Sequence, residues 1–255
     1  MTLNIALPPR DRVTIIVALI GLATVSWLYI YWFLSPMGEI GEMAMPTAFS
    51  RWTTADFALN FAIWWIMMPG MMLPSTTPMV LTFATVNRRK RARGQRFVPT
   101  AVFTTGYLVA WGLFDIVATL ADWGLERAAL MSPATQRLSP ILGTAVIIAA
   151  GAYQLTPLKY ACLRNCRSPF DFVLNHWRDG AVGALRMGVR HGLYCLGCCW
   201  LLMALLFAAG TMSLLWMAAI ASFILAEKLL PAGQWIARIS GVLMLAFGAY
   251  LLGRA

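Results

Sequence analysis

Charged side chains are scarce in this chain: Asp, Glu, Lys and Arg make up only 12% of its 255 residues. A soluble domain needs about 25% charged residues to cover its surface, so this composition excludes an ordinary soluble protein. Disorder is excluded as well, because 60% of the residues are hydrophobic. The sequence therefore predicts one integral-membrane domain over residues 1–255, all-α and built as a polytopic transmembrane helix bundle.

Nucleotide-binding motifs are also missing. The pattern G-x-x-x-x-G-K-[ST] does not occur, which excludes ATP-driven transport by this chain alone. We identify no catalytic residues, and the sequence favours a binding or transfer protein over an enzyme.

Long uncharged apolar runs mark the expected membrane spans. About 20 helical residues cross a hydrocarbon core of roughly 30 Å. Seven such runs lie near residues 13–34, 57–86, 98–121, 138–156, 192–210, 211–228 and 234–253.

The basic residues are distributed unevenly between the two sides of these spans. Only Arg51, Arg127, Arg137 and Arg254 fall on the far side, which leaves sixteen of the twenty Lys and Arg on the side of the N-terminus. Cytoplasmic loops of membrane proteins are enriched in Lys and Arg, so this bias predicts a cytoplasmic N-terminus and an outward C-terminus. Topology thus explains the net charge of +10, and we expect the lipid bilayer as partner and no nucleic acid.

Five cysteines gather at the predicted cytoplasmic end of the bundle, two after the fourth span and three at the start of the fifth. The reducing cytosol disfavours structural disulfides and favours metal ligands or redox-active thiols. On a helix, one imidazole shares a face with the last three thiols. The predicted metal ligands are Cys162, Cys166, His191, Cys195, Cys198 and Cys199.

A thiolate-rich cluster selects soft metals such as Cu(I), Zn(II) or iron over Mg(II) and Ca(II). Copper is favoured here. The cysteine spacings match neither a zinc finger nor a ferredoxin, so the spacings themselves do not identify the metal. The alternative is that each thiol packs as a small hydrophobe. Glu227 and His176 are secondary candidates at the same end of the bundle, and Glu227 has the further alternative of a boundary anchor beside Lys228.

The second span is unusual because it contains Pro69, Pro74 and Pro78. Three missing amide donors in ten residues predict a helix broken by prolines, and interrupted helices at bilayer depth often line ion sites.

Methionines surround these prolines. Met68, Met71 and Met72 have the i, i+3, i+4 spacing of a thioether ladder for Cu(I), with apolar packing as the alternative. We include Met79 as a further candidate, together with Asp115, a carboxylate inside the apolar run of the third span.

Several motifs together resemble a known family. They are the segments 71–79, 153–169 and 188–200 and the pair Glu227-Lys228. The chain resembles a bacterial family of uncharacterised polytopic proteins described as predicted metal-binding integral membrane proteins, over roughly residues 60–250. The resemblance implies a multi-pass protein of the bacterial inner (plasma) membrane that binds a metal, and it identifies neither the metal nor the reaction.

We therefore predict transfer, delivery or sensing of a soft metal, with a metallochaperone or a membrane complex as partner. A membrane thiol-disulfide oxidoreductase is the alternative from the enzyme class, in which Cys198 and Cys199, or Cys162 and Cys166, cycle between dithiol and disulfide. Neither pair is a C-x-x-C motif, although Cys195 and Cys198 form one. A third alternative is an accessory or assembly subunit of a membrane complex.

Overall fold

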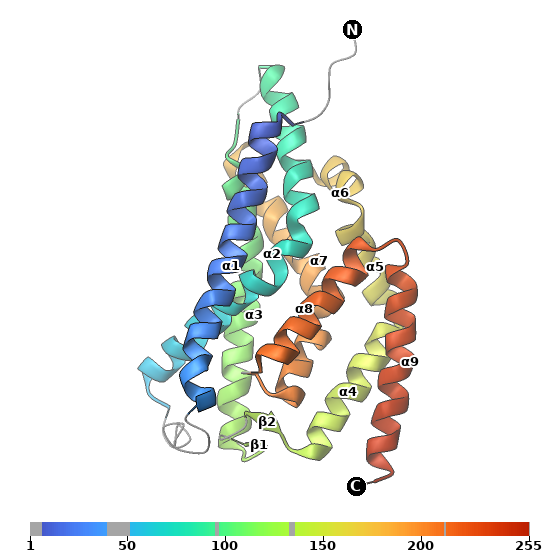
Figure 1. Cartoon of the computed structure of the whole chain (residues 1–255). Coiled ribbons are helices and arrows are strands. Elements are labelled where there is room, and N and C mark those ends of the chain that lie inside the picture. The colour runs from blue at the N-terminus through green and yellow to red at the C-terminus, as the bar shows by residue number, and fades with distance from the viewer. Residues whose placement is uncertain (1–6, 40–51, 95–96, 133–135, 212, 255) are drawn as a thin grey trace.

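The structure is a computed structural model that describes residues 7–39, 52–94, 97–132, 136–211 and 213–254. These residues form a helical bundle with one short hairpin at its lower end (Figure 1). In chain order the elements are α1 (Pro9–Glu39), α2 (Thr54–Ala92), α3 (Thr100–Arg127), β1 (Met131–Ser132), β2 (Arg137–Leu138), α4 (Pro140–Gln154), α5 (Pro157–Arg167), α6 (Pro169–His176), α7 (Gly180–Ala209), α8 (Leu214–Leu229) and α9 (Gly233–Leu252). The predicted all-α class is confirmed.

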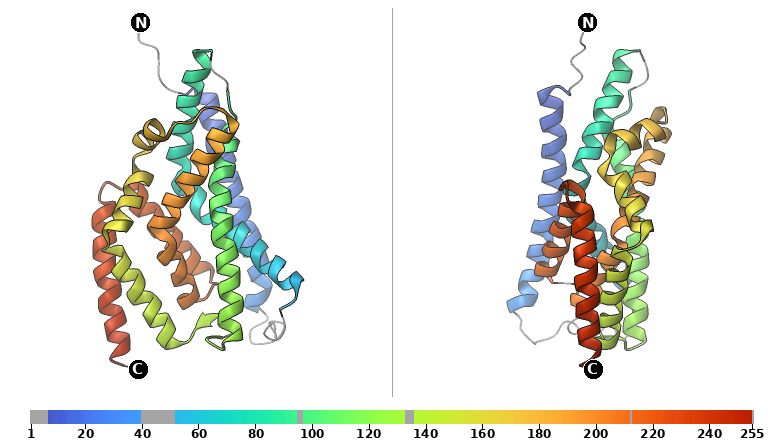
Figure 2. Two further views of the ribbon diagram at one scale, coloured as in Figure 1. Left: turned by 180° about the vertical axis from the view of Figure 1, so that it is seen from behind. Right: turned by 90° about the vertical axis from the view of Figure 1, so that its right-hand side faces the viewer.

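The long helices alternate in direction. Helices α1, α3, α7 and α9 run downward in Figure 1, whereas α2, α4 and α8 run upward, and the two further views agree (Figure 2). The basic end of α2 therefore lies at the same end of the bundle as α6, and Lys90 there forms an ion pair with Asp179. Arg51 and Arg96, two of the basic residues counted in the predicted orientation, lie outside the described residues.

Five of the described helices are long and apolar enough to cross a membrane, namely α1, α2, α3, α7 and α9. Helices α4 and α5 meet the same criterion together but bend by 67° at their junction. Helix α8 has 16 residues, so its length of about 24 Å falls short of a hydrocarbon core of roughly 30 Å. The seven spans and their orientation remain predictions.

Helix α2 corrects the prediction of a second span broken by prolines. It is one continuous helix from Thr54 to Ala92 that contains Pro69, Pro74 and Pro78. Pro74 frees the carbonyl of Gly70 four residues earlier, and the Trp27 indole of α1 donates a 3.2 Å hydrogen bond to that oxygen. A neighbouring helix thus supplies a donor to the carbonyl that lost its partner, as tolerated prolines in membrane helices require.

Glycines bring α3 and α7 into close contact. A Cβ atom at Gly106 would lie 2.2 Å from the carbonyl oxygen of Leu185, and one at Gly188 would lie 2.0 Å from that of Phe103. Small residues at such contacts let membrane helices pack backbone to backbone. This contact fixes the register of α7 against α3, and α7 carries three of the five cysteines.

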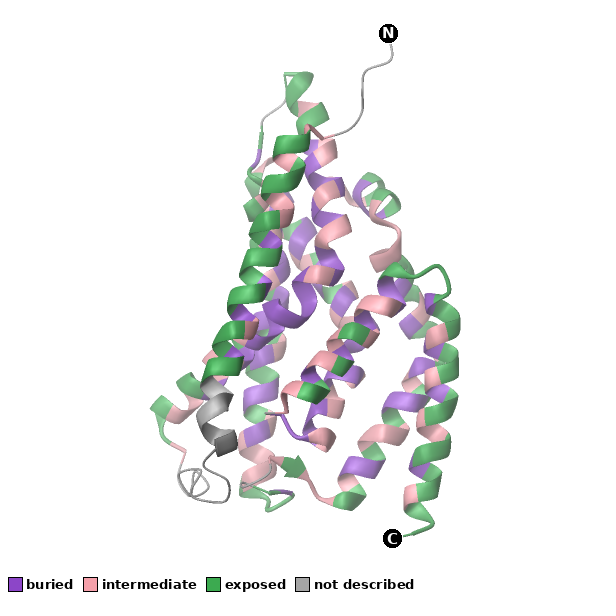
Figure 3. Ribbon diagram, viewed as in Figure 1, coloured by how far each residue is buried: buried purple, intermediate pink, exposed green. Residues whose placement is uncertain are grey.

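Buried residues concentrate on α2, α3 and α7, whereas the outer faces of α1 and α9 are largely exposed (Figure 3). The exposed side chains there are apolar: Trp32 is 70% exposed and Leu243 is 63% exposed. Large apolar surface of this kind marks a lipid or protein contact rather than a water-facing surface.

Candidate metal centre

The predicted thiols come together where α5 meets α7. The side chain of Cys166, near the end of α5, packs against the cluster that contains Cys195 and Cys198 of α7 and interacts with both thiols. Cys195 also interacts with the thiol of Cys199. All of these cysteines are free thiols. We call Cys166, Cys195, Cys198 and Cys199 the thiol centre, and it joins two segments that are about 30 residues apart in the chain.

Cys195 lies in the middle of the thiol centre. Its Sγ atom is 2.9 Å from Nζ of Lys228 and 3.2 Å from the hydroxyl of Tyr107. The Lys228 ammonium also donates to Oγ of Ser75, at 3.2 Å. A buried lysine from α8 therefore places a positive charge directly beside the sulfur that contacts the other thiols.

The remaining thiols of α7 point toward their own helix. Sγ of Cys198 donates to the Cys195 carbonyl at 3.0 Å, and Sγ of Cys199 donates to the same oxygen at 2.9 Å. Among the described residues, no three Cys, His, Asp or Glu side chains form a ready-made metal geometry. The thiol side chains must therefore change rotamer before they can coordinate a metal with three or four ligands. Two-coordinate Cu(I) needs only two sulfur atoms.

Cys162 lies one turn before Cys166 at the edge of the thiol centre. It is partly exposed, and its Sγ atom would be 2.6 Å from a Cβ atom placed at Gly197. The absence of a side chain at Gly197 thus makes room for this thiol against α7. All five predicted cysteines consequently lie at one junction of α5 with α7.

His191 lies one turn before Cys195 on α7, in an aromatic environment. Its Nε2 atom is 2.9 Å from the Thr76 hydroxyl of α2. The ring stacks on Tyr107 with centroids 5.6 Å apart and meets the edge of Phe172 at 5.4 Å. Its buried Nδ1 atom has no partner among the described residues, so one nitrogen remains available for an added ligand.

His176 is separated from the thiol centre. Its Nδ1 atom is 3.0 Å from the carbonyl of Phe172 in its own helix, and the Phe172 ring packs against both histidines. His176 therefore contacts Phe172, and Phe172 in turn contacts His191.

Glu227 and Lys228 are adjacent in α8 but have different partners, because consecutive helical residues point about 100° apart. The Glu227 carboxylate forms a buried ion pair with Lys159 of α5 at 2.8 Å, and Gln154 donates to the same carboxylate at 2.8 Å. Arg167 donates to the Glu227 backbone carbonyl at 2.8 Å. Glu227 therefore anchors α5 to α8, while Lys228 reaches the thiol centre.

The predicted methionines are buried in the bundle. Met68, Met71, Met72 and Met79 are each at most 2% exposed. The next residues of α2 contact the site, since Ser75 binds Lys228 and Thr76 faces His191. The methionine segment thus lies immediately beyond the thiol centre along α2.

Asp115 is fully buried in α3, and neither of its carboxylate oxygens has a hydrogen-bond partner among the described residues. The indole nitrogen of Trp111, one turn earlier, is also unpartnered there. Asp122, two turns later, accepts a 2.7 Å hydrogen bond from Trp64 of α2. One face of α3 thus carries buried polar groups away from the thiol centre.

Sequence reasoning missed the roles of Lys228, Lys159 and Tyr107. The two lysines looked like charges that set orientation. The sequence does contain one signal for these lysines. Glu227 and Lys228 are adjacent on one helix, so their side chains point in different directions and need different partners. Tyr107 carries no comparable sequence signal.

Comparison with known proteins gives one family. A family model described as "PpoB2: Copper chaperone" matches residues 61–251, which include all the cysteines, both histidines and Lys228. No curated protein and no solved structure matches the chain.

Proposed function

Because the chain belongs to the PpoB2 family of copper chaperones, we propose that it carries Cu(I) as cargo on the thiol centre. The observation that supports this most strongly is the contact of Cys166 from α5 with Cys195 and Cys198 from α7. Soft thiolate ligands prefer Cu(I) to hard cations. Because the copper is cargo, it enters and leaves as Cu(I) without a change of oxidation state.

Cys166 and Cys195 form the primary pair of ligands in this proposal. Each thiol releases its proton as its sulfur binds the metal. Two thiolates with one Cu(I) carry a net charge of −1, and the Lys228 ammonium beside Cys195 supplies the opposite charge. Cys198, Cys199 and the free Nδ1 atom of His191 are the further ligands within one turn.

Copper reaches the centre through α5 and its outlying thiol, Cys162. Cys162 and Cys166 are both partly exposed, whereas Cys195 is buried, so a donor protein contacts a thiol of α5 first. Thiolate exchange then passes the ion to Cys166 and Cys195. Met72, Met71 and Met68 offer thioether sulfurs farther along α2 for onward movement.

The protein acts in the bacterial inner membrane, with the thiol centre at the cytoplasmic end. The helix directions support this orientation, because they place the basic end of α2 at the same end of the bundle as α6 and the start of α7, and basic loops are cytoplasmic. The partners are a soluble metallochaperone or a membrane complex that exchanges copper with the exposed thiol.

Anaerobic metal analysis tests this function. The purified protein is loaded with Cu(I), its metal content is measured, and its affinity is determined by competition with a coloured Cu(I) chelator. We expect one tightly held copper ion and strong loss of binding in Cys195→Ser. His191→Asn should weaken binding, whereas the matched variant His176→Asn should not. Full copper retention by Cys195→Ser would contradict the proposed site.

The same preparation tests the oxidoreductase alternative, which the thiol contacts of Cys195 with Cys166 and Cys198 favour. A metal-free protein that cycles between dithiol and disulfide at one of these pairs supports an oxidoreductase. Mass spectrometry after alkylation of the free thiols identifies the pair.

A further inference from the structure

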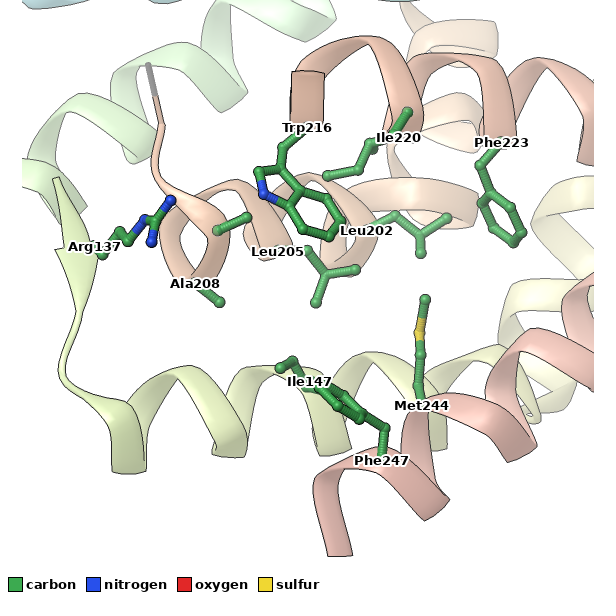
Figure 4. A pocket seen from close by; sticks show the side chains of 12 residues that line it. Arg137, Ile147, Leu202, Leu205, Ala208, Trp216, Ile220, Phe223, Met244 and Phe247 are labelled. Carbon is green, nitrogen blue, oxygen red and sulfur yellow. The ribbon is translucent and has the colours of Figure 1, made fainter. Parts of the chain in front are cut away.

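An apolar cavity lies along the second half of α7. It has a volume of about 550 Å³ and is enclosed by α7 and α8 on one side and by α4 and α9 on the other (Figure 4). Leu202 and Leu205 of α7 and Met244 of α9 line its walls. Its volume is in the range that holds a small ligand.

One charged residue borders this cavity. Arg137 of β2 lies at one end, whereas Phe223 and Met244 lie at the other (Figure 4). Within the described part of the chain, no carboxylate forms an ion pair with Arg137. Gln136 accepts a 2.8 Å hydrogen bond from Thr211, between α7 and α8, and this bond holds the strand at the end of the cavity.

The cavity is accessible from the outer face of the bundle. Two of its lining side chains are exposed there, Trp216 at 47% and Phe247 at 52%. The lining of α8 extends from Trp216 to Phe223, two helical turns or about 10 Å. The cavity is therefore apolar along its length and has the Arg137 guanidinium at one end. This arrangement is complementary to an anionic amphiphile.

We propose that this cavity binds one phospholipid, with an acyl chain between α8 and α9 and its phosphate on Arg137. Arginine recognises phosphate through two parallel hydrogen bonds, and apolar walls replace the surrounding lipid for the acyl chain. A transmembrane helix of a second copy is the other occupant of suitable polarity, but its apolar surface would leave the Arg137 charge without a partner. The bound lipid fills the space between the two helix pairs and supports α8, the helix that carries Lys228.

Native mass spectrometry of the delipidated full chain in detergent tests the proposal. Phosphatidylglycerol and phosphatidylcholine are added in separate titrations. We expect one retained phosphatidylglycerol and weaker retention of phosphatidylcholine. Arg137→Gln should lower the affinity for phosphatidylglycerol about tenfold, because a charge-assisted hydrogen bond is lost, whereas the matched Arg254→Gln variant should leave it unchanged. Ala219→Phe should prevent retention of both lipids, whereas Val242→Phe, on the outer face of α9, should not.

Copper loading of each variant is measured in the same samples. Normal loading shows that a variant is folded and separates this proposal from the proposed function. Equal retention of phosphatidylglycerol by the wild type and Arg137→Gln would overturn the headgroup assignment. Retention by Ala219→Phe, or a dimer in place of the lipid, would overturn the cavity as a lipid site.

Discussion

At the scale of single residues, the most informative feature is that neighbouring charges serve different purposes. Glu227 forms an ion pair with Lys159 at the α5–α8 contact, and Lys228 contacts Cys195 in the thiol centre. A buried charge is tolerated only when it is paired and hydrogen bonded. Glu227 meets this condition through Lys159, whereas Lys228 is hydrogen bonded to Ser75 and Cys195 and gains an opposite charge when Cys195 binds copper in the proposed function.

Removal of one partner from the buried ion pair should destabilise the fold strongly. Glu227→Leu leaves Lys159 buried without its carboxylate, and we expect a loss of about 3–5 kcal/mol in the free energy of unfolding. The double variant Lys159→Met/Glu227→Leu should recover much of this loss, since no unpaired charge remains. Thermal unfolding in detergent measures both. A single variant as stable as the wild type would contradict the pairing.

Loss of the Lys228 charge should weaken copper binding. Lys228→Met keeps the length of the side chain but removes the ammonium that faces Cys195. Because a hydrogen bond to a charged group contributes about 1.5–3 kcal/mol, we expect roughly ten- to hundredfold weaker Cu(I) affinity. Chelator competition measures the change, with Lys90→Met at the surface as the control. Unchanged affinity would show that Lys228 does not assist the metal.

At the scale of elements, the α3–α7 contact positions the site, because it sets Tyr107 of α3 against Cys195 of α7. The contact depends on glycines that leave no room for a side chain. Helix α2 depends on a different kind of contact. It continues through its prolines because the Trp27 indole of α1 donates a hydrogen bond to the carbonyl that Pro74 frees.

Two alanine substitutions in the same helix test this packing. Gly106→Ala would place its Cβ atom 2.2 Å from the backbone of α7, and we expect a destabilisation of about 1–3 kcal/mol from overpacking. Gly124→Ala has open space around its Cβ atom and should be neutral or slightly stabilising, because alanine is the better helix former. Equal melting temperatures for the two variants would contradict the close approach of α3 and α7.

The linker before α7 provides a pH-dependent contact. Hydrogen bonds from Lys90 and Trp177 hold the pKa of the Asp179 carboxyl below its ordinary value. This contact stabilises the fold above the ordinary Asp pKa of about 3.9, and its contribution is lost as the pH falls through the lower folded pKa. Asp179→Asn should therefore lower the melting temperature slightly at pH 7, and the difference should disappear in acid. A difference that persists below pH of about 2 would contradict the sign.

At the scale of the whole molecule, the proposed function depends on orientation in the membrane, because orientation would decide which compartment supplies the copper. Labelling with a membrane-impermeant maleimide tests it on intact cells. Leu130→Cys, beside β1, should react from outside, whereas Asn175→Cys, on α6, should react only after lysis. Both residues are exposed, and the wild type provides the background of the native thiols. The reverse pattern would place the thiol centre on the outer side.

The sequence by itself determined the helical class, because its hydrophobic residues fall in uncharged runs long enough for apolar helices. It also determined the candidate ligands, because thiols at helical spacing lie on one face of the helix whatever the exact residues at which the helix begins and ends. Helix α7 begins at Gly180, twelve residues before the span that the sequence predicts over 192–210.

Only the tertiary structure decided what surrounds those ligands. Cys166 meets Cys195 because α5 bends by 67° from α4. Thr156 and Pro157 mark the start of a new helix there, but they do not specify the angle. Lys228 and Tyr107 reach the thiols from two further helices, and such contacts depend on helix packing that local spacing does not specify. Residues close in the chain share a face through helical geometry, whereas residues far apart meet only through the packing of the complete bundle.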